Sequence, residues 1–133
     1  MAELAEKVAL SPSACHRRIK QLEADGVIQN YVARIDGKKI GYKIEFFVEV
    51  SLGSQQSDAL KAFEEAVSHV PEILECYLMT GHTDYIMRIA AADTADYERF
   101  YRDQLTQLPG VSRIQSSLVL RTISLSSGYA VKM

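Results

Sequence analysis

The 133-residue chain has room for one ordinary domain, or for one small module joined to one compact domain. Its 47% hydrophobic and 24% charged residues are typical of a globular protein and exclude a low-complexity or disordered chain. No apolar run approaches the roughly 18–20 residues that a membrane span needs, and the start carries no export signal. We therefore expect a cytoplasmic protein without a membrane partner.

The net charge of −2 is unevenly distributed along the chain. Residues 1–43 carry eight Lys and Arg against five Asp and Glu, whereas residues 44–133 carry seven against twelve. A basic N-terminal part on an acidic body suggests a polyanion partner for the first part only. The two cysteines, Cys15 and Cys76, lie far apart and outside any metal-ligand spacing, so we expect free thiols.

Two short helices are predicted at the N-terminus. The first covers residues 2–8. Ser11 is a natural N-cap and Pro12 fits the first turn of a second helix, which runs to about residue 24 and stops at Asp25-Gly26. Residues 27–35 alternate loosely and are predicted to form an extended strand, the wing of a winged helix-turn-helix.

The remainder of the chain predicts the element order β-α-β-β-α-β. Strict alternation marks residues 44–52 as a half-buried strand. Two right-handed crossovers in tandem place both helices on one face of a four-stranded antiparallel sheet. The other elements are a helix over residues 60–70, strands over 73–80 and 84–91, a helix capped by Asp93 or Thr94, and a long strand over 111–125.

One face of this sheet stays uncovered by helices. Apolar side chains are expected to line it, and sheets this small rarely leave such a face wet, so we expect a second copy to cover it. The candidates are Phe47, Tyr77, Met79 and Val119.

The second helix carries a basic face. Cys15, Ile19 and Leu22 recur at helical spacing as the inward stripe, and the opposite face bears Ser13, His16, Arg17 and Lys20, flanked by Arg18. A DNA major groove admits one such helix, and the helix start at Ser11 offers free N–H groups to a phosphate. The alternative is an ordinary amphipathic helix with a solvated basic face; the tight turn before it and the predicted strand after it favour DNA binding.

The loop Gly81-His82-Thr83-Asp84-Tyr85 separates two predicted strands. Asp84 is able to accept from an ammonium group and Thr83 to bond a carboxylate, which is the chemistry that a free amino acid demands. The alternative is a polar hairpin loop capped by the aspartate for structural reasons.

The sequence contains no Ser/His/Asp or Cys/His combination at a spacing typical of an active site. His16, His69 and His82 fall on three different elements, and the sequence holds no phosphate-cradling glycine loop and no metal quartet. We expect neither an enzyme, nor a cofactor, nor a metal site.

The stretch LAEKVALSPSACHRRIKQLEADGVIQNYVARID, residues 4–36, resembles the winged helix-turn-helix of the Lrp/AsnC (feast/famine) family of transcriptional regulators. GHTDY at 81–85 matches that family's Gly-x-x-Asp-Tyr loop, and LPGV at 108–111 fits it as well. The resemblance covers essentially the whole chain. It implies a ferredoxin-like dimer, often assembled further into tetramers or octamers, with an amino-acid effector between subunits.

The resemblance also assigns residues to sites. Contacts with double-stranded DNA would fall on Ser11, Ser13, His16, Arg17, Arg18 and Lys20. Effector contacts would fall on Gly81, Thr83, Asp84, Tyr85, Ser117 and Leu118.

The sequence departs from the family pattern in two ways. Family members usually carry a further helix before the position of Met1, and that helix normally packs on Leu4, Ile19 and Leu22. The family also commonly has Gly where Ala9 stands; if that position needs a positive φ, alanine costs on the order of 1 kcal/mol.

The expected fold class is therefore α+β. We expect a partial winged helix-turn-helix over residues 1–36, a linker over 37–43, and a ferredoxin-like effector-binding and oligomerisation domain over 44–133. The predicted function is transcription regulation in response to an amino acid. The competing hypotheses are a stand-alone amino-acid-binding module that does not contact DNA, and a small enzyme on the same sheet.

Overall fold

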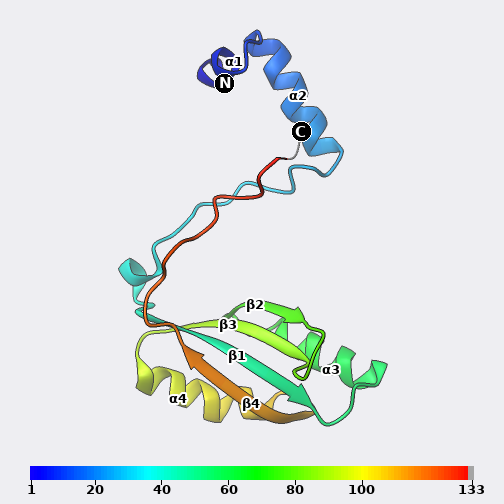
Figure 1. Ribbon diagram of the computed structural model, residues 1–133, viewed down its shortest axis with the longest axis vertical. Coiled ribbons are helices and arrows are strands. Elements are labelled where there is room, and N and C mark those ends of the chain that lie inside the picture. Colours follow the sequence, from blue (N-terminus) through cyan, green and yellow to red (C-terminus); the bar gives the residue numbers. More distant parts are fainter. Residues whose placement is uncertain (132–133) are drawn as a thin grey trace. The chain divides into compact units, whose positions relative to one another are not determined.

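The computed structural model describes residues 1–131 and divides the chain into two compact units, Met1–Ile35 and a second unit that begins at Asp36. Each unit is described by itself below. Figure 1 shows the helices of the first unit and the sheet of the second.

The first unit is the predicted helix pair, α1 (Ala2–Lys7) and α2 (Pro12–Ala24). The hydroxyl of Ser11 accepts from the backbone N–H of Ala14 at 3.2 Å, and Pro12 occupies the first turn of α2, so the predicted cap is confirmed. Ala9 has φ 57°, and among the described residues it is the one non-glycine residue with a positive φ. The turn therefore requires the left-handed backbone that glycine adopts without strain.

Two expectations for this unit were wrong. Residues 27–35 form no strand, because a strand needs a hydrogen-bonded partner and no described segment pairs with them. Leu22 was expected to point inward, yet 40% of it is exposed, whereas Cys15 is buried. The six-residue α1 is too short to cover the whole apolar stripe of α2.

The second unit contains the expected four-stranded antiparallel sheet. The strands are β1 (Ile44–Leu52), β2 (Ile73–Leu78), β3 (Tyr85–Ala91) and β4 (Val111–Leu118), in the order β2-β3-β1-β4. The helices α3 (Ser57–Val67) and α4 (Thr94–Asp103) lie against the same face of the sheet (Figure 1). This is the ferredoxin-like arrangement, and the predicted fold class is confirmed.

The core lies between the sheet and these helices. Alternation along β1 buries Val48 and Val50, and α3 contributes the fully buried Phe63. The ring of Phe46 stacks on Tyr97 of α4, with centroids 3.7 Å apart. The opposite surface of the sheet, here called the outer face, carries the alternate side chains.

The last strand is shorter than expected and ends at Leu118 rather than at residue 125. Leu118 pairs with Phe46, and the N–H of Val119 donates to the carbonyl of Glu45 at 2.9 Å. Strand β1 begins at Ile44, so the chain beyond Val119 has no neighbouring strand to extend the ladder. Leu120 is accordingly 91% exposed.

Candidate DNA-binding helix and effector site

The solvent-facing side of α2 carries the predicted DNA-binding residues. Ser11, Ser13, His16, Arg17, Arg18 and Lys20 are all exposed. Among residues 1–131 none of these basic side chains takes part in an ion pair. Their charges are therefore available to a polyanion, and the spacing puts four of the six on one face of the helix.

The loop between β2 and β3 is built around Gly81, whose φ of 107° favours glycine. It is tied to β1 by two side chains. The hydroxyl of Thr83 donates to the carbonyl of Val50 at 3.1 Å. One carboxylate oxygen of Asp84 accepts from the backbone N–H of Leu52 at 2.8 Å and from the side-chain amide of Gln55 at 3.1 Å.

These bonds give Asp84 a structural role that the sequence offered only as the alternative. The register of β1 against β4 shifts between Ser51 and Leu52, and the carboxylate satisfies the N–H at that irregularity. Its second oxygen makes no hydrogen bond within the described residues. The loop is thereby fixed in place, with one carboxylate oxygen left for another donor.

A hollow of about 180 Å³ lies beside this loop on the outer face. It is lined by Glu49, Ser51, His82, Thr83, Arg113 and Gln115. Glu49 pairs with Gln115, and Ser51 pairs with Arg113. Glu49 and Arg113 therefore lie on neighbouring strands, diagonally across the ladder and on the same face of the sheet. Among residues 1–131 neither of these two charges makes an ion pair. The outer-face hollow therefore presents one unpaired anion and one unpaired cation.

The predicted effector residues do not all meet there. Thr83 lines the hollow, and Ser117 lies opposite Phe47 on the same outer face. Tyr85 instead belongs to the core: it is 1% exposed and its hydroxyl donates to Glu64 at 2.5 Å. Burial and that bond raise the pKa of the Tyr85 phenol. Leu118 pairs with Phe46 on the helix-covered face.

Four residues of the hollow were missed by sequence reasoning, namely Glu49, Ser51, Arg113 and Gln115. Alternation along residues 44–52 does put Glu49 on the outer face. The strand pairing that brings it next to Arg113 joins segments more than sixty residues apart, and no local pattern reveals it.

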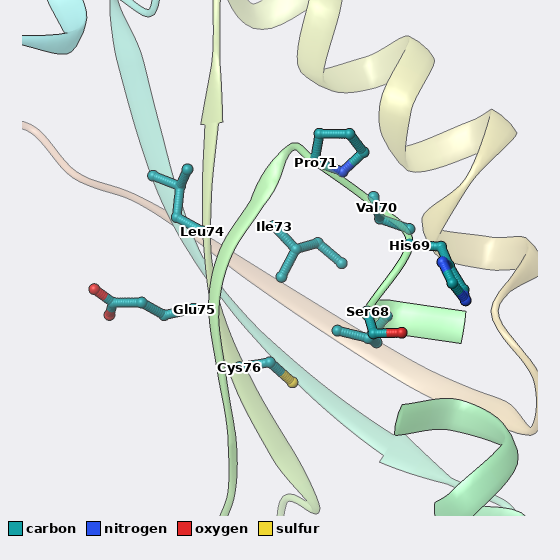
Figure 2. Close-up of a pocket in the computed structure, with 9 residues that line it drawn as sticks. Ser68, His69, Val70, Pro71, Ile73, Leu74, Glu75 and Cys76 are labelled. Atoms are coloured by element: carbon teal, nitrogen blue, oxygen red, sulfur yellow. The ribbon is translucent and has the colours of Figure 1, made fainter. Parts of the chain in front are cut away.

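A second hollow, of about 380 Å³, lies where the end of α3 leads into β2 (Figure 2). Ile73 and Cys76 point into it, whereas Leu74 and Glu75 point to the other side of the strand (Figure 2). Its histidine, His69, is engaged by Glu65 at 2.9 Å. Burial raises the pKa of the Cys76 thiol to about 11, so the thiol that lines this hollow stays neutral and is a poor nucleophile. The carboxylate of this hollow, Glu75, is paired with Arg88, so the hollow does not present an unpaired anion beside an unpaired cation.

The outer face also carries an ion-pair network. Arg88 donates to Glu45 at 2.9 Å and to Glu75 at 3.1 Å. The bond from Arg88 lowers the pKa of Glu75 below its ordinary value, and the hydroxyl of Tyr77 adds a further bond. Within residues 1–131 no cluster of His, Cys, Asp and Glu is arranged to hold a metal ion, and no helix is long and apolar enough to cross a membrane.

Comparison with known proteins decides the family. The Lrp/AsnC ligand binding domain matches residues 45–129, and a winged helix-turn-helix DNA-binding domain matches residues 1–29. The chain belongs to the Lrp/AsnC family. The family members to which it is similar are transcriptional regulators and not enzymes, so the expectation that it is not an enzyme is confirmed.

Three relatives of this Lrp/AsnC regulator illustrate the likeness. The Bkd operon transcriptional regulator of Pseudomonas aeruginosa is 39% identical over 125 residues, which cover 94% of this chain and 82% of the relative. The leucine-responsive regulatory protein of Escherichia coli is 32% identical over 130 residues, 98% of this chain and 79% of the relative. A transcriptional regulator of Neisseria meningitidis, solved in complex with L-methionine, superposes with a TM-score of 0.92 at 36% identity, over 97% of this chain and 83% of that one.

Proposed function

We propose that this regulator binds a free amino acid in the outer-face hollow and that the bound amino acid changes its affinity for DNA. The observation that carries the proposal is the pair of unpaired charges, Glu49 and Arg113, beside the fixed loop 81–84. A free amino acid is a zwitterion, with an ammonium and a carboxylate close together. The L-methionine in the Neisseria relative supports this ligand class.

The proposed contacts follow from the chemistry of the two ends of the ligand. The guanidinium of Arg113 forms paired hydrogen bonds with the carboxylate, a geometry that arginine favours. Glu49 and the free oxygen of Asp84 accept from the ammonium. Thr83 and the backbone at Gly81 close the site from the loop, and Ser117 borders it on the outer face. Tyr85 lies in the core behind the loop, and Leu118, which pairs with Phe46, is not part of the proposed site.

DNA binding is proposed for the exposed face of α2. Arg17 and Lys20 reach base edges or phosphates in the major groove, and Arg18 a backbone phosphate. His16, Ser11 and Ser13 complete this surface.

We further propose that the protein is a dimer formed through the outer face, which becomes the unit of larger assemblies. Phe47 is 42% exposed, Tyr77 53% and Met79 44%, more apolar surface than a small sheet normally leaves in water. A second copy on this face would also deepen the outer-face hollow. Sedimentation at micromolar concentration should show at least a dimer; a single species near 15 kDa would contradict this. Because a DNA-binding regulator must reach the chromosome, we propose that the protein acts in the cytoplasm.

The test of the effector proposal is a thermal-shift screen of the twenty amino acids. A ligand at 100 times its Kd adds about 2.7 kcal/mol to stability, so a cognate amino acid should raise the melting temperature clearly. The same amino acid should change the affinity for DNA. Arg113→Gln should abolish the shift without changing the melting temperature of the unliganded protein.

The matched control is Arg99→Gln, which removes an exposed arginine of α4 that pairs with Asp96 at 3.3 Å and does not line the outer-face hollow. It should leave the amino-acid shift intact. Wild-type binding by the Arg113→Gln protein would contradict the proposed site, and no response to any of the twenty would contradict the ligand class.

A further inference from the structure

A short 3₁₀ turn, Gly37–Ile40, opens the second unit. The carboxylate of Asp36 accepts from the backbone N–H of Lys38 at 3.1 Å and caps the turn. The N–H of Tyr42 donates to the carbonyl of Gly37 at 2.9 Å, and Gly41 reverses the chain with φ 103°. The segment is therefore a defined turn with its own hydrogen bonds.

Three lysines project from this turn and its flank. Lys38, Lys39 and Lys43, here called the lysine turn, are all exposed. None of them makes an ion pair within residues 1–131, although residues 44–133 carry twelve acidic residues against seven basic ones. The nearest acidic side chains in sequence are both engaged elsewhere: Asp36 is the cap, and Glu45 pairs with Arg88 at 2.9 Å. The lysine turn is thus a local positive patch without counter-charge on an acidic unit.

We propose that the lysine turn is a second DNA contact, which binds backbone phosphates without reading base sequence. The proposal rests on the proposed DNA binding by α2. Duplex DNA carries one negative charge per roughly 1.7 Å of its axis, and lysine is a compact point charge on a flexible stem, suited to phosphates rather than to bidentate base contacts.

The position in the chain supports the same partner. Lys38 follows Ile35, the last residue of the helix-turn-helix unit, by three residues. Counted from Ala24, the end of α2, Lys38 lies fourteen residues along the chain, so once α2 is bound the lysine turn stays at raised local concentration near the same duplex. Without such a patch, the acidic second unit would be repelled by the DNA that the first unit binds.

The experiment measures how the affinity for a 40-base-pair duplex of random sequence depends on salt between 50 and 200 mM, by fluorescence anisotropy. Random sequence suffices because phosphate contacts do not depend on sequence. The variants are the triple Lys38→Gln, Lys39→Gln, Lys43→Gln; the same triple to Arg; and Lys61→Gln, an exposed lysine of α3. Melting temperatures are measured beside them.

In the Gln triple, binding should be weaker throughout, and the slope of log affinity against log salt should fall. The expected fall is about 0.9 for each phosphate that a copy of the variant no longer neutralises. The Arg triple and Lys61→Gln should keep the wild-type slope. An unchanged slope in the Gln triple would overturn the proposal, and so would an equal fall in the Arg triple, because charge would then not be the cause.

Failure of the underlying function gives a different result. If the wild-type protein does not bind the duplex at any salt concentration, DNA binding by α2 fails and the lysine turn fails with it. If the wild type binds and Arg17→Ala weakens binding while the Gln triple does not, only the lysine turn is overturned.

Discussion

The two units of this regulator are held together in different ways. The second unit has a continuous core in which Val48, Phe63, Met87, Ile89 and Leu105 are fully buried. In residues 1–35 only Ala5 and Cys15 are buried, whereas Leu4, Val8 and Leu22 are 40–50% exposed. The shape of the first unit depends on local devices, the Ser11 cap and the left-handed turn at Ala9.

This difference follows from size and suits the two functions. Residues 1–35 bury little apolar surface among themselves, so hydrogen bonds within each turn define their shape. The basic face of α2 is exposed, as contact with a polyanion requires. A site for a small zwitterion needs charges held at fixed positions, which a packed sheet provides.

The largest expected effect tests the comparison directly. Phe63→Ala removes a fully buried ring from the core and should lower the free energy of unfolding of the second unit by about 3–5 kcal/mol. Leu22→Ala, in the first unit, should cost less than about 1 kcal/mol, because the side chain is already 40% exposed. Urea unfolding followed by circular dichroism measures both, and equal losses would show that the first unit also depends on a tight core.

Asp84 should separate stability from ligand binding. Asp84→Ala leaves the N–H of Leu52 unpaired, which should cost about 1–3 kcal/mol, and it should also abolish amino-acid binding. Asp84→Asn keeps an acceptor for that N–H but removes the negative charge, so stability should largely return while binding stays weak. DNA affinity should hold in both. Calorimetry with the amino acid found by the screen is the measurement, and wild-type binding by either variant would leave Asp84 with its structural role alone.

Changes on α2 should leave the second unit untouched. Arg17→Ala should cost about 1–3 kcal/mol in operator binding and relax sequence preference if Arg17 contacts a base. Lys20→Ala should lower affinity across all sequences and reduce the salt slope by about 0.9 if Lys20 contacts a phosphate. Both variants should bind the amino acid as the wild type does. Wild-type DNA binding by both would mean that another surface contacts DNA.

Ala9→Gly should stabilise the first unit by up to about 1 kcal/mol. The positive φ of 57° strains alanine, and glycine relieves this, less the entropy that glycine loses on folding. Ala14→Gly, within α2, is the matched control and should instead destabilise by roughly 0.5–1 kcal/mol. The helical signal during thermal melting distinguishes the two. If Ala9→Gly and Ala14→Gly both lowered the stability, Ala9 would not be strained in the native turn.

The smallest effect concerns acid stability of the outer face. The bond from Arg88 lowers the folded-state pKa of Glu75, so its stabilising contribution is present above the ordinary value near 4.5 and is lost as pH falls through the lowered value. The side chain is 41% exposed, so the contribution should stay below about 1 kcal/mol. Glu75→Gln should remove that part of the acid dependence in urea unfolding between pH 7 and pH 3. The control is Glu3→Gln, which removes the exposed Glu3–Lys7 pair of α1 and should leave the contribution of the Arg88–Glu75 pair unchanged.

Several local features of this protein follow from sequence alone. Ser11 and Pro12 predict the start of α2, because a helix cap depends on residues within one turn of it. For α4 the sequence offers Asp93 or Thr94 as the cap, and the structure has Asp93. The alternation of apolar and polar residues predicts both ends of β1, because successive side chains of a strand point to opposite faces of the sheet. The positive φ of Ala9 agrees with the resemblance to a family that commonly has Gly at this position.

Tertiary structure decided the rest, because it depends on which distant segments pair. Residues 27–35 have the composition of a strand but pair with no other segment of residues 1–131. Strand β4 ends at Leu118 because β1 begins at Ile44 and leaves nothing further to pair with. Tyr85 lies in the core because the register of β3 against β1 turns it there. Glu49 and Arg113 become neighbours through the pairing of β1 with β4, and such pairing is set by the packing of the whole sheet rather than by either strand's own residues.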